Sequence, residues 1–215
     1  MSNFIVMISG RGSNLEAICK NGLSSNISCV ISNNPEAKGL QIAKQYSITS
    51  IVINNRSFAN REEFEKALIK VIDEHNPKLI VLAGFMRILS PFFVNKYPQK
   101  IINIHPSLLP SFIGVNAQQQ AFNTKVKVSG ATVHFVTNEL DYGPIIAQGA
   151  VPILENDDCN NVANKILTLE HKLYPFVIKK IINDQVKLKN DGYVIVEKSD
   201  DDSKYFNSLI NYIFY

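Results

Sequence analysis

The stretch that decides the fold is Ile101–Pro110, which reads IINIHPSLLP. Its isoleucine-rich first half, Ile101–His105, predicts a buried β-strand. Side chains alternate along a strand, so Asn103 and His105 should share one face. Pro106 cannot donate to a sheet, so the strand should end there and present an amide and an imidazole together. In open α/β sheets, ligands bind at this carboxyl edge.

A structural explanation competes with a functional one for both polar residues. His105 could be a core histidine that bonds to the backbone, and Asn103 could bridge backbone groups at the end of the strand. However, two polar side chains interrupt one face of an otherwise apolar strand, and burying both is unfavourable unless each is paired. The pattern therefore favours a functional site.

Strands and helices alternate on the amino-terminal side of this stretch. The apolar strands need helices on both faces, and the alternation is typical of right-handed crossovers. We therefore predict an α/β fold, namely a doubly wound, mostly parallel, Rossmann-like sheet with helices on both faces. The expected strands are Phe4–Ser9, Ile27–Ser32, Ser50–Ile53 and Lys78–Ala83, and the expected helices begin after Ser13 and cover 36–46, 61–75 and 91–96.

The carboxyl-terminal half predicts fewer but longer elements. We expect a helix over 116–122, followed by strands over 128–136 and 145–153. A helix capped by Asp157 or Asp158 should then run to about 184, and a hairpin should follow over 186–196. We predict one catalytic domain over 1–196, followed by an acidic loop and aromatic tail over 197–215. The acidic run Asp200–Asp202 should be a solvated loop.

Composition limits the possible classes of function. The chain has 215 residues, 46% hydrophobic and 19% charged, with a formal net charge of +3. These values are those of an ordinary globular protein and give no reason to expect nucleic acid or membrane as a partner. The absence of a signal-like amino terminus, and an odd number of scattered cysteines, lead us to expect a cytoplasmic protein. No His or Cys pair has the spacing of metal ligands, so no metal is expected.

A glycine-rich turn follows the first strand. Gly10-Arg11-Gly12-Ser13-Asn14 joins that strand to a helix, which is the geometry of an anion-binding loop. Ser13 and Glu16 have capping-box spacing. The alternative is a tight turn without a ligand, because the motif is neither a dinucleotide fingerprint nor a Walker loop.

Two further segments should reach the same sheet edge. Gly84–Ser90, an apolar loop containing one arginine, could form a pocket for a flat aromatic ligand or could simply pack beneath the next helix. Thr137–Pro144 carries acids that a histidine could use, and His134 in the preceding strand could line the site.

Through these motifs, the sequence resembles the glycinamide ribonucleotide transformylases of the formyltetrahydrofolate-dependent transferase family. The matching segments lie in order along about residues 4 to 190: ISGRGSNL (8–15), LAGFMRILSP (82–91), NIHPSLLP (103–110), VHFVT (133–137) leading to LD (140–141), and EHKLYP (170–175).

The resemblance implies a reaction of purine biosynthesis. The amine of phosphoribosylglycinamide attacks the formyl group of the cosubstrate 10-formyltetrahydrofolate. The catalytic residues implied are Asn103 as a donor to the oxyanion, His105 as the general acid, and Asp141 as the partner that raises the pKa of His105.

The resemblance also implies the binding residues. For the nucleotide these are Gly12, Ser13 and Asn14 at the phosphate, together with Leu167, Thr168, Leu169 and Glu170. For the folate they are Arg61, Met86, Arg87, Ile88, Leu89, Asn103, Thr137, Asn138, Glu139, Leu140 and Asp141. The implied partners are small molecules only, and the implied assembly is a monomer or a homodimer.

One segment departs from the transformylase pattern. In Phe112–Asn116, Ile113 and Asn116 are more similar to formyltetrahydrofolate deformylase, which hydrolyses the same formyl group. Because this chain begins at the first strand, a deformylase would have to lack its regulatory domain. Methionyl-tRNA formyltransferase would need a further carboxyl-terminal domain. A non-catalytic nucleotide-binding module would leave Asn103, His105 and Asp141 unexplained.

Overall fold

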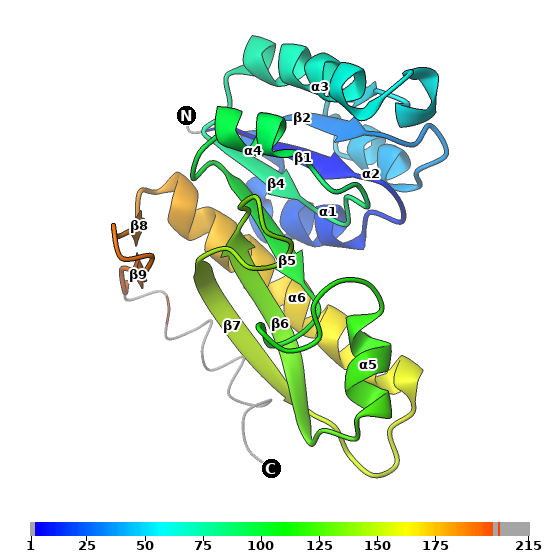
Figure 1. Ribbon diagram of the computed structural model, residues 1–215, viewed down its shortest axis with the longest axis vertical. Helices are drawn as coiled ribbons and strands as arrows, with labels where there is room; N and C mark the ends of the chain where they lie inside the picture. The colour runs from blue at the N-terminus through cyan, green and yellow to red at the C-terminus, as the bar shows by residue number, and fades with distance from the viewer. Residues whose placement is uncertain (1–2, 200–201, 203–215) are drawn as a thin grey trace. The chain divides into compact units, whose positions relative to one another are not determined.

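The computed structural model describes residues 3–199 and Asp202. The strand order is β3-β2-β1-β4-β5-β6-β7, and β8 and β9 form a separate hairpin. The sheet is mostly parallel, which confirms the predicted α/β class (Figure 1). The described residues divide into two compact units, one built from those up to Asn103 together with Val136–Asn138 and the other from Ile104–Phe135 and those from Glu139 onward.

The first unit holds the parallel strands. Its elements are β1 (Phe4–Ile8), α1 (Ser13–Ile18), η1 (Cys19–Leu23), η2 (Ser24–Asn26), β2 (Ile27–Ser32), α2 (Gly39–Gln45), β3 (Ser50–Val52), η3 (Asn55–Ser57), α3 (Arg61–His75), β4 (Leu79–Leu82), α4 (Pro91–Lys96) and the first part of β5 (Ile101–His105). Their registers are parallel throughout, with Val6 opposite Val30 on one side and Val81 on the other.

Helices cover both faces of these strands, as predicted. Ile5 and Met7 of β1 belong to a core cluster that includes Phe64 of α3 and Phe93 of α4. The alternate residue Ile8 faces the other way and packs against Gly39 at the start of α2. Every residue of β1 is buried, which is why its sequence is continuously apolar rather than alternating.

The second unit is built on an antiparallel pair. It contains α5 (Ala117–Asn123), β6 (Val128–Phe135), β7 (Ile145–Pro152), α6 (Cys159–Ile182), β8 (Val186–Leu188) and β9 (Val194–Val196). Helix α6 contacts both β6 and β7. Gly130 and Gly149 face each other so closely that a Cβ on Gly130 would lie 1.9 Å from the Gly149 carbonyl oxygen.

Most predicted elements agree with the structure within a few residues, and two details were wrong. Ser13 is not a helix cap, because it is the first residue of α1 and Gly12 precedes it as an N-cap without a side-chain bond. The acidic run is not simply a solvated loop, because Asp202 is only 7% exposed and its carboxylate lies 2.8 Å from Lys180 Nζ. The predicted aromatic tail, 204–215, lies outside the described residues.

Candidate functional site

Strand β5 ends at His105, as the proline after it predicts. His105 is 4% exposed. Asn103 belongs to the same strand, so alternation gives it the same face as His105. The turn after His105 is fixed by Thr132 of β6, whose hydroxyl donates to the Ser107 carbonyl at 2.7 Å and accepts from the Leu109 N–H at 3.1 Å. The end of the strand is therefore held rigidly.

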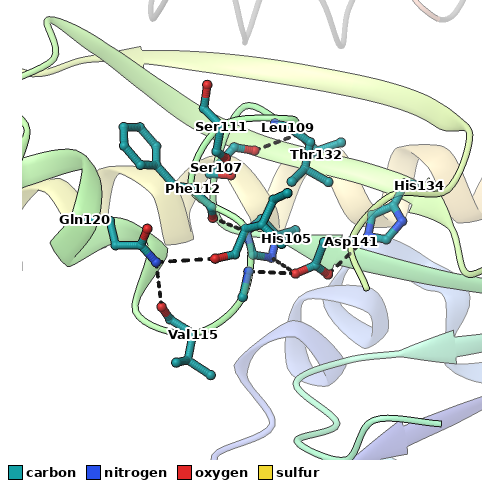
Figure 2. Close-up of polar contacts among 12 residues, drawn as sticks. His105, Ser107, Leu109, Ser111, Phe112, Val115, Gln120, Thr132, His134 and Asp141 are labelled. Carbon is teal, nitrogen blue, oxygen red and sulfur yellow. Dashed lines mark hydrogen bonds and ion pairs between the residues drawn. The ribbon is translucent and has the colours of Figure 1, made fainter. Parts of the chain in front are cut away.

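Both ring nitrogens of His105 face oxygen acceptors (Figure 2). Nε2 lies 2.8 Å from the carbonyl oxygen of Phe112, and Nδ1 lies 3.4 Å from Oδ2 of Asp141. The Phe112 carbonyl can only accept, so the hydrogen of that contact lies on Nε2, and Nδ1 is the nitrogen that faces the carboxylate. The ring of His105 is therefore held between a backbone carbonyl and a carboxylate.

The carboxylate of Asp141 lies between two histidines. Its Oδ2 accepts the N–H of Gly114 at 3.0 Å in addition to facing His105, and its Oδ1 lies 3.9 Å from Nε2 of His134. The Asp141 side chain is only 8% exposed. Its backbone has a φ of 52°, in the left-handed region that aspartate tolerates better than most residues. The loop thus turns this carboxylate toward both rings.

His134 is the more deeply buried of the two imidazoles. Burial lowers its pKa, and the positive charge that His105 can carry adds to this effect, although Asp141 and the Phe135 carbonyl oppose it. Its Nδ1 lies 2.9 Å from that carbonyl oxygen, which requires the hydrogen to be on Nδ1. The other ring nitrogen, Nε2, lies on the side of Asp141.

The segment Phe112–Asn116 closes over the pair of His105 and Asp141. Three of its residues, Phe112, Gly114 and Asn116, have positive φ values. Gln120 of α5 donates from Nε2 to the Val115 carbonyl at 2.9 Å. This is the segment whose sequence departs from the transformylase pattern, and it contacts His105 and Asp141 through backbone atoms.

The glycine-rich loop lies in the first unit and leads directly into α1. Gly12 has a φ of 79°, and a Cβ there would lie 2.5 Å from the Cα of Gly39. Gly39 in turn donates its N–H to the Gly10 carbonyl at 3.0 Å. Ser13 and Asn14 follow as the first residues of the helix. Glycine is therefore required at position 12 by packing against α2, irrespective of any ligand.

The predicted folate residues fall into both units. In the first, Met86 and Ile88 are 78% and 62% exposed, Leu89 is buried, and Arg61, Arg87, Thr137 and Asn138 lie at or near the surface. Asn138 donates to Oδ1 of Asn95 at 3.1 Å. In the second unit, Glu139 and Leu140 are exposed beside Asp141.

The predicted nucleotide residues of α6 have different environments. Leu169 and Glu170 are buried, Leu167 is half-buried and Thr168 is exposed. The Thr168 hydroxyl donates back to the Asn164 carbonyl at 2.8 Å. Leu169 packs against Gly149 of β7, so its role in the structure is to join the helix to the strand.

Two contacts to the site were missed because backbone groups make them. The Phe112 carbonyl and the Gly114 N–H carry no side-chain signature, and only the glycine at 114 hinted at an unusual backbone.

Within residues 3–199 and 202, no three His, Cys, Asp or Glu side chains are grouped to hold a metal ion. Over the same residues, no helix is long and apolar enough to cross a membrane.

Comparisons with known proteins identify the relatives of this chain. Residues 2–178 match the model of the formyl transferase family. The phosphoribosylglycinamide formyltransferase of Escherichia coli is 42% identical over 88% of this chain and 92% of its own length. The corresponding enzyme of Bacillus subtilis is 42% identical over 85% of this chain and 95% of its own length.

Solved structures agree with the sequence comparison. The crystal structure of phosphoribosylglycinamide formyltransferase from Anaplasma phagocytophilum has a TM-score of 0.86 and 48% identity, covering 93% of this chain and 97% of its own. Glycinamide ribonucleotide transformylase 1 from Symbiobacterium toebii has a TM-score of 0.88 and 36% identity, covering 92% and 95%. The chain therefore belongs to the formyl transferase family.

Proposed function

We propose that this protein is a phosphoribosylglycinamide formyltransferase, an enzyme of purine biosynthesis. The observation that carries the proposal is the 42% identity with the Escherichia coli enzyme, which extends over 92% of that enzyme's length. The buried pair of His105 and Asp141 supports it, because formyl transfer needs a group that can supply a proton at the reacting centre.

The reaction we propose uses 10-formyltetrahydrofolate as the formyl donor. The amine of phosphoribosylglycinamide attacks the formyl carbon, and a tetrahedral oxyanion forms. The bond from this carbon to the folate nitrogen then breaks. The folate nitrogen gains a proton and the attacking amine loses one, so the products are formylglycinamide ribonucleotide and tetrahydrofolate.

Three side chains have roles in this scheme. Asn103 donates its amide N–H to the oxyanion. His105 delivers a proton to the leaving nitrogen, in keeping with its position beside the Asp141 carboxylate. Asp141 stabilises the charged ring by its negative charge and is itself held by the Gly114 N–H.

Binding of the two substrates is assigned by family resemblance and supported by local geometry. The phosphate is proposed to bind the backbone of Gly12, Ser13 and Asn14, where a helix begins directly after a tight glycine turn. Residues 86–89 and 137–141 are proposed to bind the folate, and the exposed apolar side chains of Met86 and Ile88 suit an aromatic ligand. Glu170 is proposed to contact the nucleotide.

A deformylase is the alternative that Ile113 and Asn116 suggest, and the names of the relatives favour the transferase over it. Incubating the protein with 10-formyltetrahydrofolate, with and without phosphoribosylglycinamide, distinguishes the two. Production of tetrahydrofolate only when the nucleotide is present supports the transferase. A cytoplasmic location, small-molecule partners only, and a monomer or homodimer remain predictions.

A further inference from the structure

The loop that carries Met86 and Ile88 is held at both ends by side chains from elsewhere in the first unit. The ladder between β1 and β4 continues past both strands, since the N–H of Ser9 donates to the Gly84 carbonyl at 3.2 Å. Gly84 has a φ of 72°, so the chain turns there and leaves the ladder. The next segment needs a different anchor.

Ser9 supplies that anchor with its hydroxyl. Its Oγ accepts the N–H of Met86 at 2.8 Å and donates to Oδ1 of Asn33 at 2.5 Å. The Asn33 amide donates from Nδ2 to Oδ1 of Asn55 at 2.9 Å, which fixes Oδ1 as the atom facing the hydroxyl. The hydroxyl proton therefore points toward Asn33, and an oxygen lone pair remains for Met86.

Glu65 anchors the other end of the loop. This carboxylate is 1% exposed, and its Oε1 accepts the N–H of Ser90 at 2.8 Å while its Oε2 accepts the Ser90 hydroxyl. A buried carboxylate is unfavourable unless its oxygens are bonded, so the geometry of Ser90 is strongly determined. Between the two anchors, Met86 and Ile88 remain exposed.

We propose that Ser9 and Glu65 are positioning residues for the formyl donor. They hold the backbone of residues 86–90 so that the exposed apolar side chains present a preformed surface to the folate ring. Preorganisation of this kind improves affinity by reducing the ordering that the ligand must impose. The inference rests on the proposed function, because that function assigns residues 86–89 to the folate.

Ser9 lies directly before the glycine-rich loop, so a substitution there could affect the binding of either ligand. Replacing its side chain leaves the two backbone contacts of Ser9 unchanged, namely the N–H to Gly84 and the carbonyl that accepts Asn34 Nδ2 at 3.2 Å. The path of the chain into the glycine-rich loop should therefore persist in Ser9→Ala. The variant loses the anchor of Met86 and the bond from the hydroxyl to Asn33, whose Nδ2 still donates to Asn55. Folate affinity should therefore fall while nucleotide affinity does not.

Titration calorimetry with tetrahydrofolate and, separately, with phosphoribosylglycinamide tests this. Ser9→Ala should weaken tetrahydrofolate binding by about tenfold, the scale of one lost hydrogen bond, and change nucleotide binding by less than about twofold. Ser9→Thr, which keeps the hydroxyl, should restore most of the folate affinity. Glu65→Gln, which keeps the shape but not the charge, should also weaken folate binding selectively.

The matched control is Ser28→Ala, which removes a hydroxyl that donates to the Phe4 carbonyl at 3.2 Å in the same sheet, away from the loop. Unchanged tetrahydrofolate affinity in Ser9→Ala, or an equal loss in Ser28→Ala, would overturn the inference. The test measures binding and not turnover, so it can fail independently of the proposed function. A wild-type protein that binds both ligands but does not transfer the formyl group would contradict the proposed function. The comparison of Ser9→Ala with Ser28→Ala would still decide whether Ser9 positions the folate-binding loop.

Discussion

Nδ1 of His105 lies 3.4 Å from Oδ2 of Asp141, while Nε2 of the same ring lies 2.8 Å from the Phe112 carbonyl oxygen. The imidazole therefore has an anion on one side and a neutral acceptor on the other. The carbonyl accepts the hydrogen on Nε2, and the carboxylate is the only charged group that faces Nδ1 among the printed contacts of the ring.

The first prediction concerns that carboxylate. Asp141→Asn keeps the size of the side chain and an acceptor for the Gly114 N–H, but it removes the charge beside His105. Turnover should fall by about two to three powers of ten, while nucleotide affinity should change little. Steady-state kinetics and calorimetry on the same preparation test this, and full activity in the variant would contradict the assigned role of Asp141.

A second prediction concerns His134 and the pH dependence of stability. The pKa of His134 is lowered in the folded protein because burial disfavours its charged form. The unfolded chain then binds a proton more readily, so the contribution of His134 to stability is fully present above its unfolded pKa of about 6.5 and is lost as pH falls through the folded pKa.

Urea unfolding at pH 7.5 and pH 5.5 measures this contribution. The free energy of unfolding of the wild type should fall between the two pH values, and His134→Gln should show a smaller fall because it has no titrating group there. An identical pH dependence in both proteins would show that His134 is not the group responsible.

The third prediction separates packing from ligand binding in the glycine-rich loop. Gly12→Ala places a Cβ 2.5 Å from Gly39 Cα at a φ of 79°, so it should lower the free energy of unfolding by about 1–3 kcal/mol. Gly10→Ala is the matched control, since its Cβ would meet no atom within 4 Å. Chemical denaturation should show no more than about 0.5 kcal/mol of loss for the control. Equal losses would mean that the close approach to Gly39 is unimportant.

The fold was predictable from sequence because its signals are local. Continuous apolar strands and the proline after His105 each act within a few residues, and α3 begins and ends as predicted. The contacts of the site were less accessible. Phe112 and Gly114 contribute only backbone atoms, and the bond from Ser9 to Met86 joins residues separated by 77 positions. Asp202 was misjudged because its partner, Lys180, lies on a distant helix.

The fourth prediction follows from that buried pair. Lys180 Nζ donates to the Glu197 carbonyl, the Ser199 hydroxyl and the Asp202 carboxylate at 2.9, 3.0 and 2.8 Å. Burial alone would raise the pKa of Asp202, but the bonds from Lys180 and from the hydroxyl and N–H of Ser199 hold that pKa below its usual range. The stability that Asp202 contributes is therefore present above about pH 4 and is lost as pH falls through its lower folded pKa.

Deletion after Ser199 tests this pair. The shortened chain should unfold at a temperature several degrees lower, because a buried ammonium loses its carboxylate. It should keep its turnover at lower temperature, because every proposed site residue precedes Ser199. Adding Lys180→Met to the shortened chain should recover part of the stability. No recovery would indicate that the deletion acts through other residues, and a large fall in turnover would show that the removed segment takes part in catalysis.

The central claim is that formyl loss from the donor is coupled to the nucleotide amine. The most direct measurement follows tetrahydrofolate and formate production from 10-formyltetrahydrofolate, with and without phosphoribosylglycinamide, in the wild type and in His105→Ala. We predict that the wild type forms tetrahydrofolate only with the nucleotide present and releases no formate, and that His105→Ala is slower by about two to three powers of ten. Rapid formate release without the nucleotide would contradict the account and identify a deformylase.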